Sequence, residues 1–236
     1  MFRNKPIEAA LINAVKSAEW ATVEAYKNGR VEHEPSITDR FLGHLEYAIA
    51  GICLQKIDVP NLDGRSLVFR AKTLTSTIAN SQEKLHGADF LAVFHLDLPG
   101  YRVSKGFLVQ SKRLEETQTL TGSDLTRLRN QCQTMLDRSP VAYVWLYSTK
   151  GIRVVSAIDV LGADIIPFNP YLLTTWTLSQ FFKAHFGCLV GDFRITASTP
   201  EELDFLLRSF EARSGVVISG TCLVDGEELP RLRMPG

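Results

Sequence analysis

The sequence predicts an α/β domain in which a mixed central β-sheet is flanked by helices. Segments with helical and strand periodicity follow one another as two helices, three strands, a helix, a hairpin and further helices. The 236 residues are 45% hydrophobic and 22% charged, the balance of a globular chain that can bury a core. No repeat or linker interrupts this pattern. We therefore expect one domain over residues 1–236, with an added helix in 1–33, a core in 34–160 and a C-terminal helical and strand extension in 161–236.

Two helices are predicted at the N-terminus. Apolar residues recur at helical spacing over residues 6–27, with Pro6 near the start and Gly29 just past the end. After a polar connection, apolar residues recur with the same period from Ile37 to Ile52, which predicts a second helix over residues 35–53.

Three strands and a helix follow. Residues 66–75 alternate between polar and apolar types, which is typical of a strand, and a polar loop then reaches Gly87. Two apolar runs, 89–96 and 106–111, predict the next strands, because Pro99 and Gly100 between them favour a turn. Helical spacing then returns over residues 124–136.

The last part of the chain adds strands and helices in alternation. The uninterrupted apolar run 141–147 predicts a buried strand, and the turn residues 148–151 make 152–155 its hairpin partner. Helices are predicted over 178–186 and 200–213, the second with Thr199 as its N-cap. Residues 216–224 predict a final strand.

Composition narrows the classes of function. The formal net charge is zero, which argues against a protein that binds DNA tightly by itself. It does not exclude an enzyme with a local basic groove, or an enzyme that a partner protein recruits to DNA. The four cysteines are widely spaced and form no Cys-x-x-Cys pair, which argues against a zinc site and for reduced thiols. Because no secretory signal or bilayer-spanning apolar run is present, we expect a cytoplasmic protein without a membrane partner.

Polar side chains stand where two predicted strands should carry core residues. Asp89 precedes the apolar run of one strand, while Gln110 and Lys112 end the next. Residues two apart share a face of a strand, so pairing of these strands would let Asp89 approach Gln110 and Lys112. The carboxylate and amide oxygens suit Mg²⁺, and a lysine beside the metal can activate water for attack on a phosphodiester. The alternative is ordinary solvation of strand ends.

The second helix offers a further carboxylate. At about 100° per residue, Glu34 projects onto the same side as Phe41 and Leu45, whereas Asp39 and Glu46 fall opposite, towards solvent. Glu34 is therefore the acid that we expect at the site. The alternative is that Glu34 is only a helix-start residue favoured by the helix dipole.

This order of elements resembles the PD-(D/E)XK, or restriction-endonuclease-like, nuclease superfamily, whose core is α-β-β-β-α-β with a β-meander. The matching stretches, within residues 34–148, are "EPSITDRFLGHLE", "GADFLAVF", "GFLVQSK" and "LRNQCQTML". The "GAD…QSK" phrasing resembles nucleases of bacterial antiphage defence and modification-dependent restriction. The resemblance implies a metal-dependent DNA endonuclease that acts with a sensor protein, an ATPase or a second copy of itself.

The resemblance also implies roles for individual residues. Glu34 would be the helix acid and Asp89 the main ligand of Mg²⁺ or Mn²⁺, and Lys112 the catalytic lysine. Gln110 and the backbone carbonyl of Ser111 would complete the ligands. Gln131 would lie near the site and could contact substrate. Apart from the resemblance, we expect basic residues near the site that could contact substrate phosphates, with a solvated helix face as the alternative: Lys105, Arg113, Arg127, Arg129 and Arg138.

One departure from the family pattern keeps other functions open. Gln110 is neutral where the family usually has an acid, so the site should hold its metal more weakly and depend more on Glu34. One alternative is a catalytically inactive nuclease-fold subunit that serves as a protein-interaction module. Another is a hydrolase of RNA or of a small molecule on the same scaffold.

Overall fold

The structure, a computed structural model, describes residues 5–55, 65–75, 88–164 and 166–224. The helices are α1 (Lys5–Lys27), α2 (Glu34–Ala50), α3 (Gly122–Arg138), α4 (Ala157–Gly162), α5 (Leu178–Phe186) and α6 (Pro200–Phe210), with a 3-10 helix, η3 (Pro170–Leu172). The strands are β1 (Cys53–Leu54), β2 (Arg65–Thr75), β3 (Phe90–Leu98), β4 (Tyr101–Arg113), β5 (Ala142–Ser148), β6 (Gly151–Ser156), β7 (Thr175–Thr177) and β8 (Ser214–Val224). The loop expected before Gly87 lies outside the described residues.

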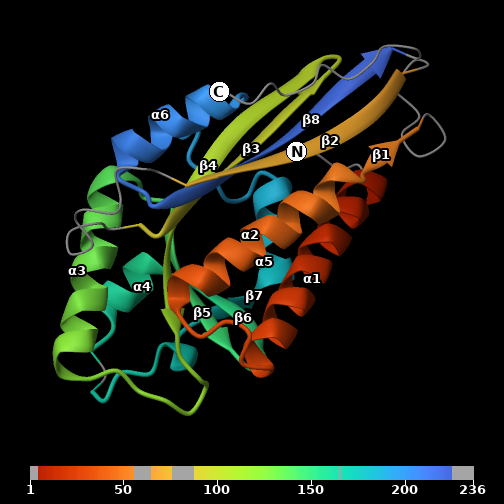
Figure 1. Cartoon of the computed structure of the whole chain (residues 1–236). Helices are drawn as coiled ribbons and strands as arrows, with labels where there is room; N and C mark the ends of the chain where they lie inside the picture. Colours follow the sequence, from red (N-terminus) through yellow and green to blue (C-terminus); the bar gives the residue numbers. More distant parts are fainter. Residues whose placement is uncertain (1–4, 56–64, 76–87, 165, 225–236) are drawn as a thin grey trace.

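All eight strands form one mixed sheet, in the order β1-β2-β8-β3-β4-β5-β6-β7. The β3/β4, β5/β6, β6/β7, β1/β2 and β2/β8 pairs are antiparallel, whereas β3/β8 and β4/β5 are parallel. Helices cover both faces (Figure 1). The predicted α/β class with a mixed sheet flanked by helices is therefore confirmed.

The alternation of side chains along the strands builds two hydrophobic cores. In β3, Phe90 and Phe94 point to the core under α1, α2 and α5, whereas Leu91 and Val93 point to the core under α3, α4 and α6. Because both faces are buried, β3 reads as a continuous apolar run rather than an alternating one. Figure 1 shows α1 and α2, in red and orange, side by side over one face.

Local signals determine where several helices begin. Pro35 stands in the first turn of α2, where its missing N–H is not needed. Thr199 caps α6, since its hydroxyl oxygen accepts from the backbone N–H of Glu202 at 3.2 Å. A reciprocal capping box of Thr177 and Gln180 begins α5.

The C-terminal strand changes the order that the resemblance implied. In a β-meander, β2 would lie beside β3, but β8 is inserted between them and pairs with both. The range 161–236, expected as an extension, therefore contributes a strand to the middle of the sheet. Strand β1 pairs with one edge of β2, and β4 pairs with one edge of β3. The other edge of each strand has unpaired backbone N–H and C=O groups, and β8 forms hydrogen bonds with both.

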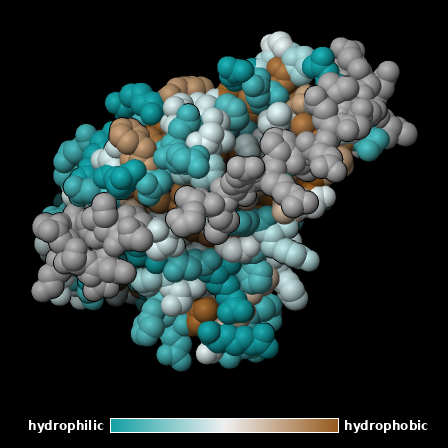
Figure 2. Space-filling model, turned by 45° about the horizontal axis from the view of Figure 1, so that its top comes forward, coloured by the Kyte–Doolittle hydropathy of each residue, from teal (hydrophilic) through white to brown (hydrophobic). Residues whose placement is uncertain are grey.

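One face of the molecule is seen in the space-filling view of Figure 2. The face in Figure 2 is mostly hydrophilic, with hydrophobic side chains in small separate patches. Within the described ranges, no helix has both the length and the apolar character needed to cross a bilayer.

Candidate active site

Asp89 lies immediately before β3, where three strands meet. Its backbone N–H donates to Val109 of β4 at 2.8 Å, and its carbonyl accepts from the N–H of Ser214, at the start of β8, at 3.1 Å. These bonds anchor Asp89 on both sides. Its carboxylate Oδ2 accepts from the backbone N–H of Ser111 at 2.7 Å and from the Gln110 amide at 2.5 Å.

The Gln110 amide nitrogen joins two oxygens of this cluster. Gln110 Nε2 donates to Asp89 Oδ2 and also to the backbone carbonyl of Ser111, at 3.2 Å. The two oxygens therefore converge on one electropositive group. Gln110 is 3% exposed, and its own amide oxygen is buried without a hydrogen-bond donor among the described residues. An unpaired buried acceptor of this kind is costly, and such groups are nearly always satisfied by a protein donor, a water or an ion.

Glu34 reaches the same end of the sheet from the first turn of α2. Its Oε1 accepts from the backbone N–H of Arg113 at 2.9 Å and lies 3.5 Å from the ammonium of Lys112. The Lys112 side chain is 17% exposed, so this pair is partly shielded from water. The structure thus brings Glu34, Lys112, Gln110 and Asp89 together.

Three buried hydroxyl groups support this cluster from behind. Thr38 Oγ1 lies 2.8 Å from Ser111 Oγ and 3.0 Å from the hydroxyl of Tyr147, and it donates to the carbonyl of Glu34 at 3.0 Å. The network ties α2 to β4 and β5. Thr38 and Tyr147 were not predicted as site residues, because a hydroxyl on an apolar helix face or strand carries no chemical signal by itself.

The electrostatic environment of Asp89 is unusual for a carboxyl group. Its pKa is raised to about 6, and burial is the largest cause. The N–H of Ser111 opposes this shift, whereas the negative charge of Glu34 adds to it. The positive charges of Arg213 and Lys112 also lower the pKa, which means that two cations act on this carboxyl.

Arg213 is a residue of this site that the sequence analysis did not identify. It precedes Ser214, which bonds the backbone of Asp89. Its guanidinium makes two hydrogen bonds to the Asp39 carboxylate, at 3.0 and 2.9 Å, and one to the carbonyl of Pro35 at 3.2 Å. Only the insertion of β8 beside β3 brings it here, so no local pattern could have indicated it.

Two acids of α2 expected in solvent make contacts instead. Asp39 is 47% exposed but forms the ion pair with Arg213. Glu46 accepts from the backbone N–H of Thr73 at 2.8 Å and from its hydroxyl, and lies 3.7 Å from Lys72. The expectation for Glu46 was wrong, because helical periodicity does not reveal that β2 runs beside this face.

The remaining substrate-contact candidates are not part of the cluster. Arg113 is exposed at the end of β4 and donates to the carbonyl of Glu32 at 2.6 Å. Arg127 is exposed and Gln131 half-buried on α3, and within the described ranges neither side chain makes a hydrogen bond to the cluster. Their proposed roles stay predictions.

Three other basic residues expected near the site have structural contacts elsewhere. Lys105 is fully buried and donates to the carbonyls of His185 and Val190. Arg129 donates to the carbonyl of Ala163 at 2.5 Å and stacks over Phe168. Arg138 binds the carbonyl of Phe210 and the carboxylate of Glu211. We therefore correct the expectation that these groups line the site.

The cluster contains oxygen atoms of the kind that a hard divalent cation accepts. In the part of the chain that the structure describes, no group of three or more His, Cys, Asp or Glu side chains could hold a metal ion. A cation here would need Asp89, Glu34, the unpaired amide oxygen of Gln110 and the carbonyl of Ser111. These are all oxygen ligands, which Mg²⁺ and Mn²⁺ accept. Rotation of the Gln110 amide would exchange its nitrogen for its oxygen.

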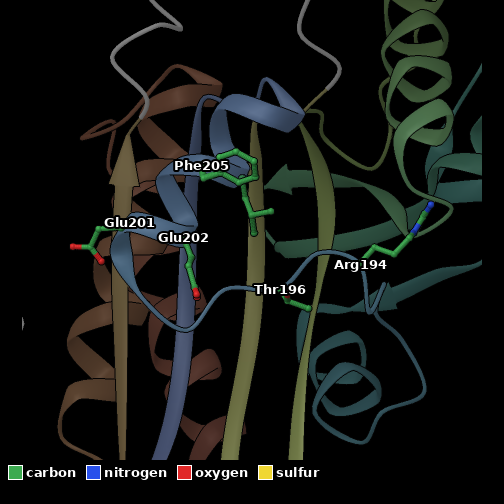
Figure 3. A pocket seen from close by; sticks show the side chains of 6 residues that line it. Arg194, Thr196, Glu201, Glu202 and Phe205 are labelled. Carbon is green, nitrogen blue, oxygen red and sulfur yellow. The ribbon is translucent and has the colours of Figure 1, made fainter.

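A separate hollow lies against α6. It measures about 460 Å³ and is lined by residues of α6 and of the segment before it: Arg194, Thr196, Glu201, Glu202, Phe205 and Leu206. Figure 3 shows Phe205 and Glu202 from α6, with Thr196 and Arg194 from the preceding segment. The Glu202 carboxylate already accepts from the backbone N–H and hydroxyl of Ser198. None of the proposed site residues lines this hollow.

Comparison of the chain with family models, with curated proteins and with solved structures gave no match.

Proposed function

We propose that this chain is a Mg²⁺- or Mn²⁺-dependent endonuclease of the PD-(D/E)XK kind that hydrolyses phosphodiester bonds in DNA. The observation that carries the proposal is the convergence of the Asp89 carboxylate and the Ser111 carbonyl on one donor of Gln110. Glu34 and Lys112 lie at the same end of the sheet. A divalent cation in place of that donor would satisfy both oxygens.

Each side chain has a role in this proposal. Asp89, Gln110, the Ser111 carbonyl and Glu34 would hold the cation, which when bound polarises the phosphate and lowers the pKa of water. The Lys112 ammonium would stabilise the charge that develops on phosphate oxygens and orient the attacking water. Glu34 holds Lys112 in position through the 3.5 Å ion pair.

We further propose that the nuclease acts in the cytoplasm with a partner, as an effector of bacterial antiphage defence. The formal net charge of zero supports a recruited enzyme, since little long-range attraction to DNA is available. The partner would be a sensor protein, an ATPase or a second copy of the chain.

A second candidate is an inactive nuclease-fold subunit that binds another protein. It is favoured by the contacts of Asp89, whose Oδ2 accepts from the backbone N–H of Ser111 and from the Gln110 amide, so that protein groups satisfy this oxygen. The neutral side chain of Gln110 would then record the loss of activity.

Cleavage of supercoiled plasmid separates these candidates. With Mg²⁺ or Mn²⁺, we expect the wild type to nick DNA, and Lys112→Ala and Asp89→Asn to lose activity about a hundredfold or more, because the first removes charge stabilisation and the second removes the charge of a metal ligand. The readout is the conversion of supercoiled plasmid to open-circular DNA on agarose gels.

The matched control for Lys112→Ala is Lys183→Ala. Lys183 is also ion-paired, with Glu8 at 3.1 Å, but joins α5 to α1. Lys183→Ala should cut like the wild type. Equal cutting by the wild type and all three variants would assign the activity to a contaminant and favour the inactive subunit. Cutting of RNA in preference to DNA would favour an RNA hydrolase.

A further inference from the structure

Arg213 and Lys112 stand on either side of Asp89, and α2 holds both. Lys112 belongs to β4 and pairs with Glu34, whereas Arg213 precedes β8 and pairs with Asp39. Strands β8 and β4 are the two neighbours of β3. The two cations therefore flank the start of β3, directly after Asp89, the proposed metal ligand.

The Arg213 guanidinium is oriented rather than mobile. Asp39 binds it through two hydrogen bonds and the Pro35 carbonyl through a third, while the side chain remains 22% exposed. A guanidinium has five N–H donors, and these bonds use three of them, one on Nη1 and two on Nη2. The second N–H of Nη1 is therefore left for an acceptor such as a phosphate oxygen, whereas Nε is buried.

The charges around the site leave a need for this cation. Asp89, Glu34 and Asp39 are acids, and Lys112 is engaged by Glu34. Until the proposed divalent cation is bound, a DNA backbone that approached Asp89 would meet the repulsion of these carboxylates. A fixed positive charge on the β8 side would offset that repulsion at the place where the phosphate must lie.

We infer that Arg213 is the DNA-binding cation of this site, which contacts a backbone phosphate next to Asp89 while Asp39 holds its guanidinium. The inference rests on the function proposed above. It adds to that function a residue from the C-terminal part of the chain, outside the stretch that resembles the nuclease superfamily.

A purely structural role predicts a different result. Arg213 also anchors α2 to the start of β8, and loss of that anchor alone would weaken DNA binding equally at every salt concentration. A lost phosphate contact instead lowers the dependence of affinity on salt, because one fewer counterion is released.

The experiment measures the affinity of the full chain for a short fluorescent DNA duplex by anisotropy, over a series of salt concentrations, with Ca²⁺ replacing Mg²⁺. Arg213→Gln should bind about tenfold more weakly, with a salt slope smaller in magnitude by about 1. Arg213→Lys should keep the wild-type slope and lose only part of the affinity. The matched control is Arg208→Gln, since Arg208 also pairs with an aspartate, Asp204, at 2.7 Å, but on α6.

The outcomes distinguish this inference from the function on which it rests. A wild type that cuts DNA while Arg213→Gln binds with unchanged slope overturns the inference alone. A wild type that neither binds nor cuts DNA overturns both. If Arg213→Gln shows no cooperative melting by circular dichroism, it does not fold and the Arg213→Lys variant is used instead. Lysine keeps the positive charge, so a smaller salt slope of DNA affinity in this variant would overturn the inference.

Discussion

Asp89 and Asp192 are two carboxyl groups whose surroundings move their pKa values in opposite directions. Burial raises the pKa of Asp89 to about 6. Hydrogen bonds from the Arg194 side chain lower the pKa of Asp192 to about 2. Asp192 also accepts from the hydroxyl of Ser139 at 2.8 Å, which favours its ionised form further. The raised pKa favours the neutral form of Asp89, whereas the lowered pKa favours the ionised form of Asp192.

This difference predicts how the metal-free protein responds to pH. The folded pKa of Asp89 is raised, so its contribution to stability is fully present below about pH 4 and is lost as the pH rises through about 6. Asp89→Asn avoids this loss. At pH 8 its free energy of unfolding should exceed that of the wild type by about 3 kcal/mol, with little difference at pH 4, in urea titrations with EDTA present.

The control variant is Asp192→Asn, for which the sign reverses. The folded pKa of Asp192 is lowered, so its stabilisation is present above about pH 4 and is lost as the pH falls through about 2. Asp192→Asn should therefore be less stable than the wild type at pH 8. Parallel pH profiles of wild type and Asp89→Asn would show that the Asp89 site is not desolvated.

At the scale of elements, β4 depends on a close approach at Gly106. Strand β5 pairs with β4 only from Leu108 onwards, so Gly106 has no partner in β5. Asp192 pairs with this edge of β4 instead, through two backbone hydrogen bonds with Gly106 at 3.0 and 2.8 Å. β4 begins at Tyr101, five residues before the strand predicted over residues 106–111, because residues 101–105 pair with the end of β3, from Leu98↔Tyr101 to Phe94↔Lys105. The adjoining Lys105 is buried because the segment before Asp192 supplies carbonyls for its ammonium.

Two glycine substitutions test this packing. A Cβ at Gly106 would lie 2.5 Å from the Ile195 side chain and 2.7 Å from the backbone oxygen of Ala92, so Gly106→Ala should destabilise the fold by about 1–3 kcal/mol. Gly43, on an exposed turn of α2, has open space around its Cβ position. Gly43→Ala should stabilise the fold by about 0.5–1 kcal/mol. Urea unfolding gives both values, and similar signs for the two variants would contradict the close approach.

At the scale of the whole molecule, the last strand of the chain is central to the sheet. Residues Val216, Val217 and Ile218 of β8 are 1%, 3% and 1% exposed, and β8 pairs on both sides. The sheet is therefore incomplete until the C-terminal part of the chain is available. Folding of such non-local pairings is slow, because loop closure precedes the contacts that stabilise it.

Hydrogen exchange provides the test at this scale. We expect the backbone amides of Val216, Val217 and Ile218 to exchange only through global unfolding, together with those of β3. Amides of the three-residue edge strand β7 should exchange faster, through local opening. Faster exchange in β8 than in β3 would mean that β8 unfolds separately, as an extension would.

The sequence by itself determined the local elements and one part of the candidate site. Apolar periodicity predicted the five longer helices and the main strands, because side-chain spacing reports which face of an element is buried. Alternation along β4 placed Gln110 and Lys112 on one face, and the β3/β4 hairpin brought Asp89 to Gln110. These relations are short in sequence, so local rules suffice for them.

Only the tertiary structure decided the rest. Four features of the structure join segments that are far apart in the chain. They are the insertion of β8, the position of Arg213 beside Asp89, the bonds between Glu46 and Thr73, and the hydroxyl network of Thr38. Such contacts depend on which strand edges and helix faces remain unpaired after local structure has formed. That is a property of the assembled sheet, and periodicity within a single segment does not contain it.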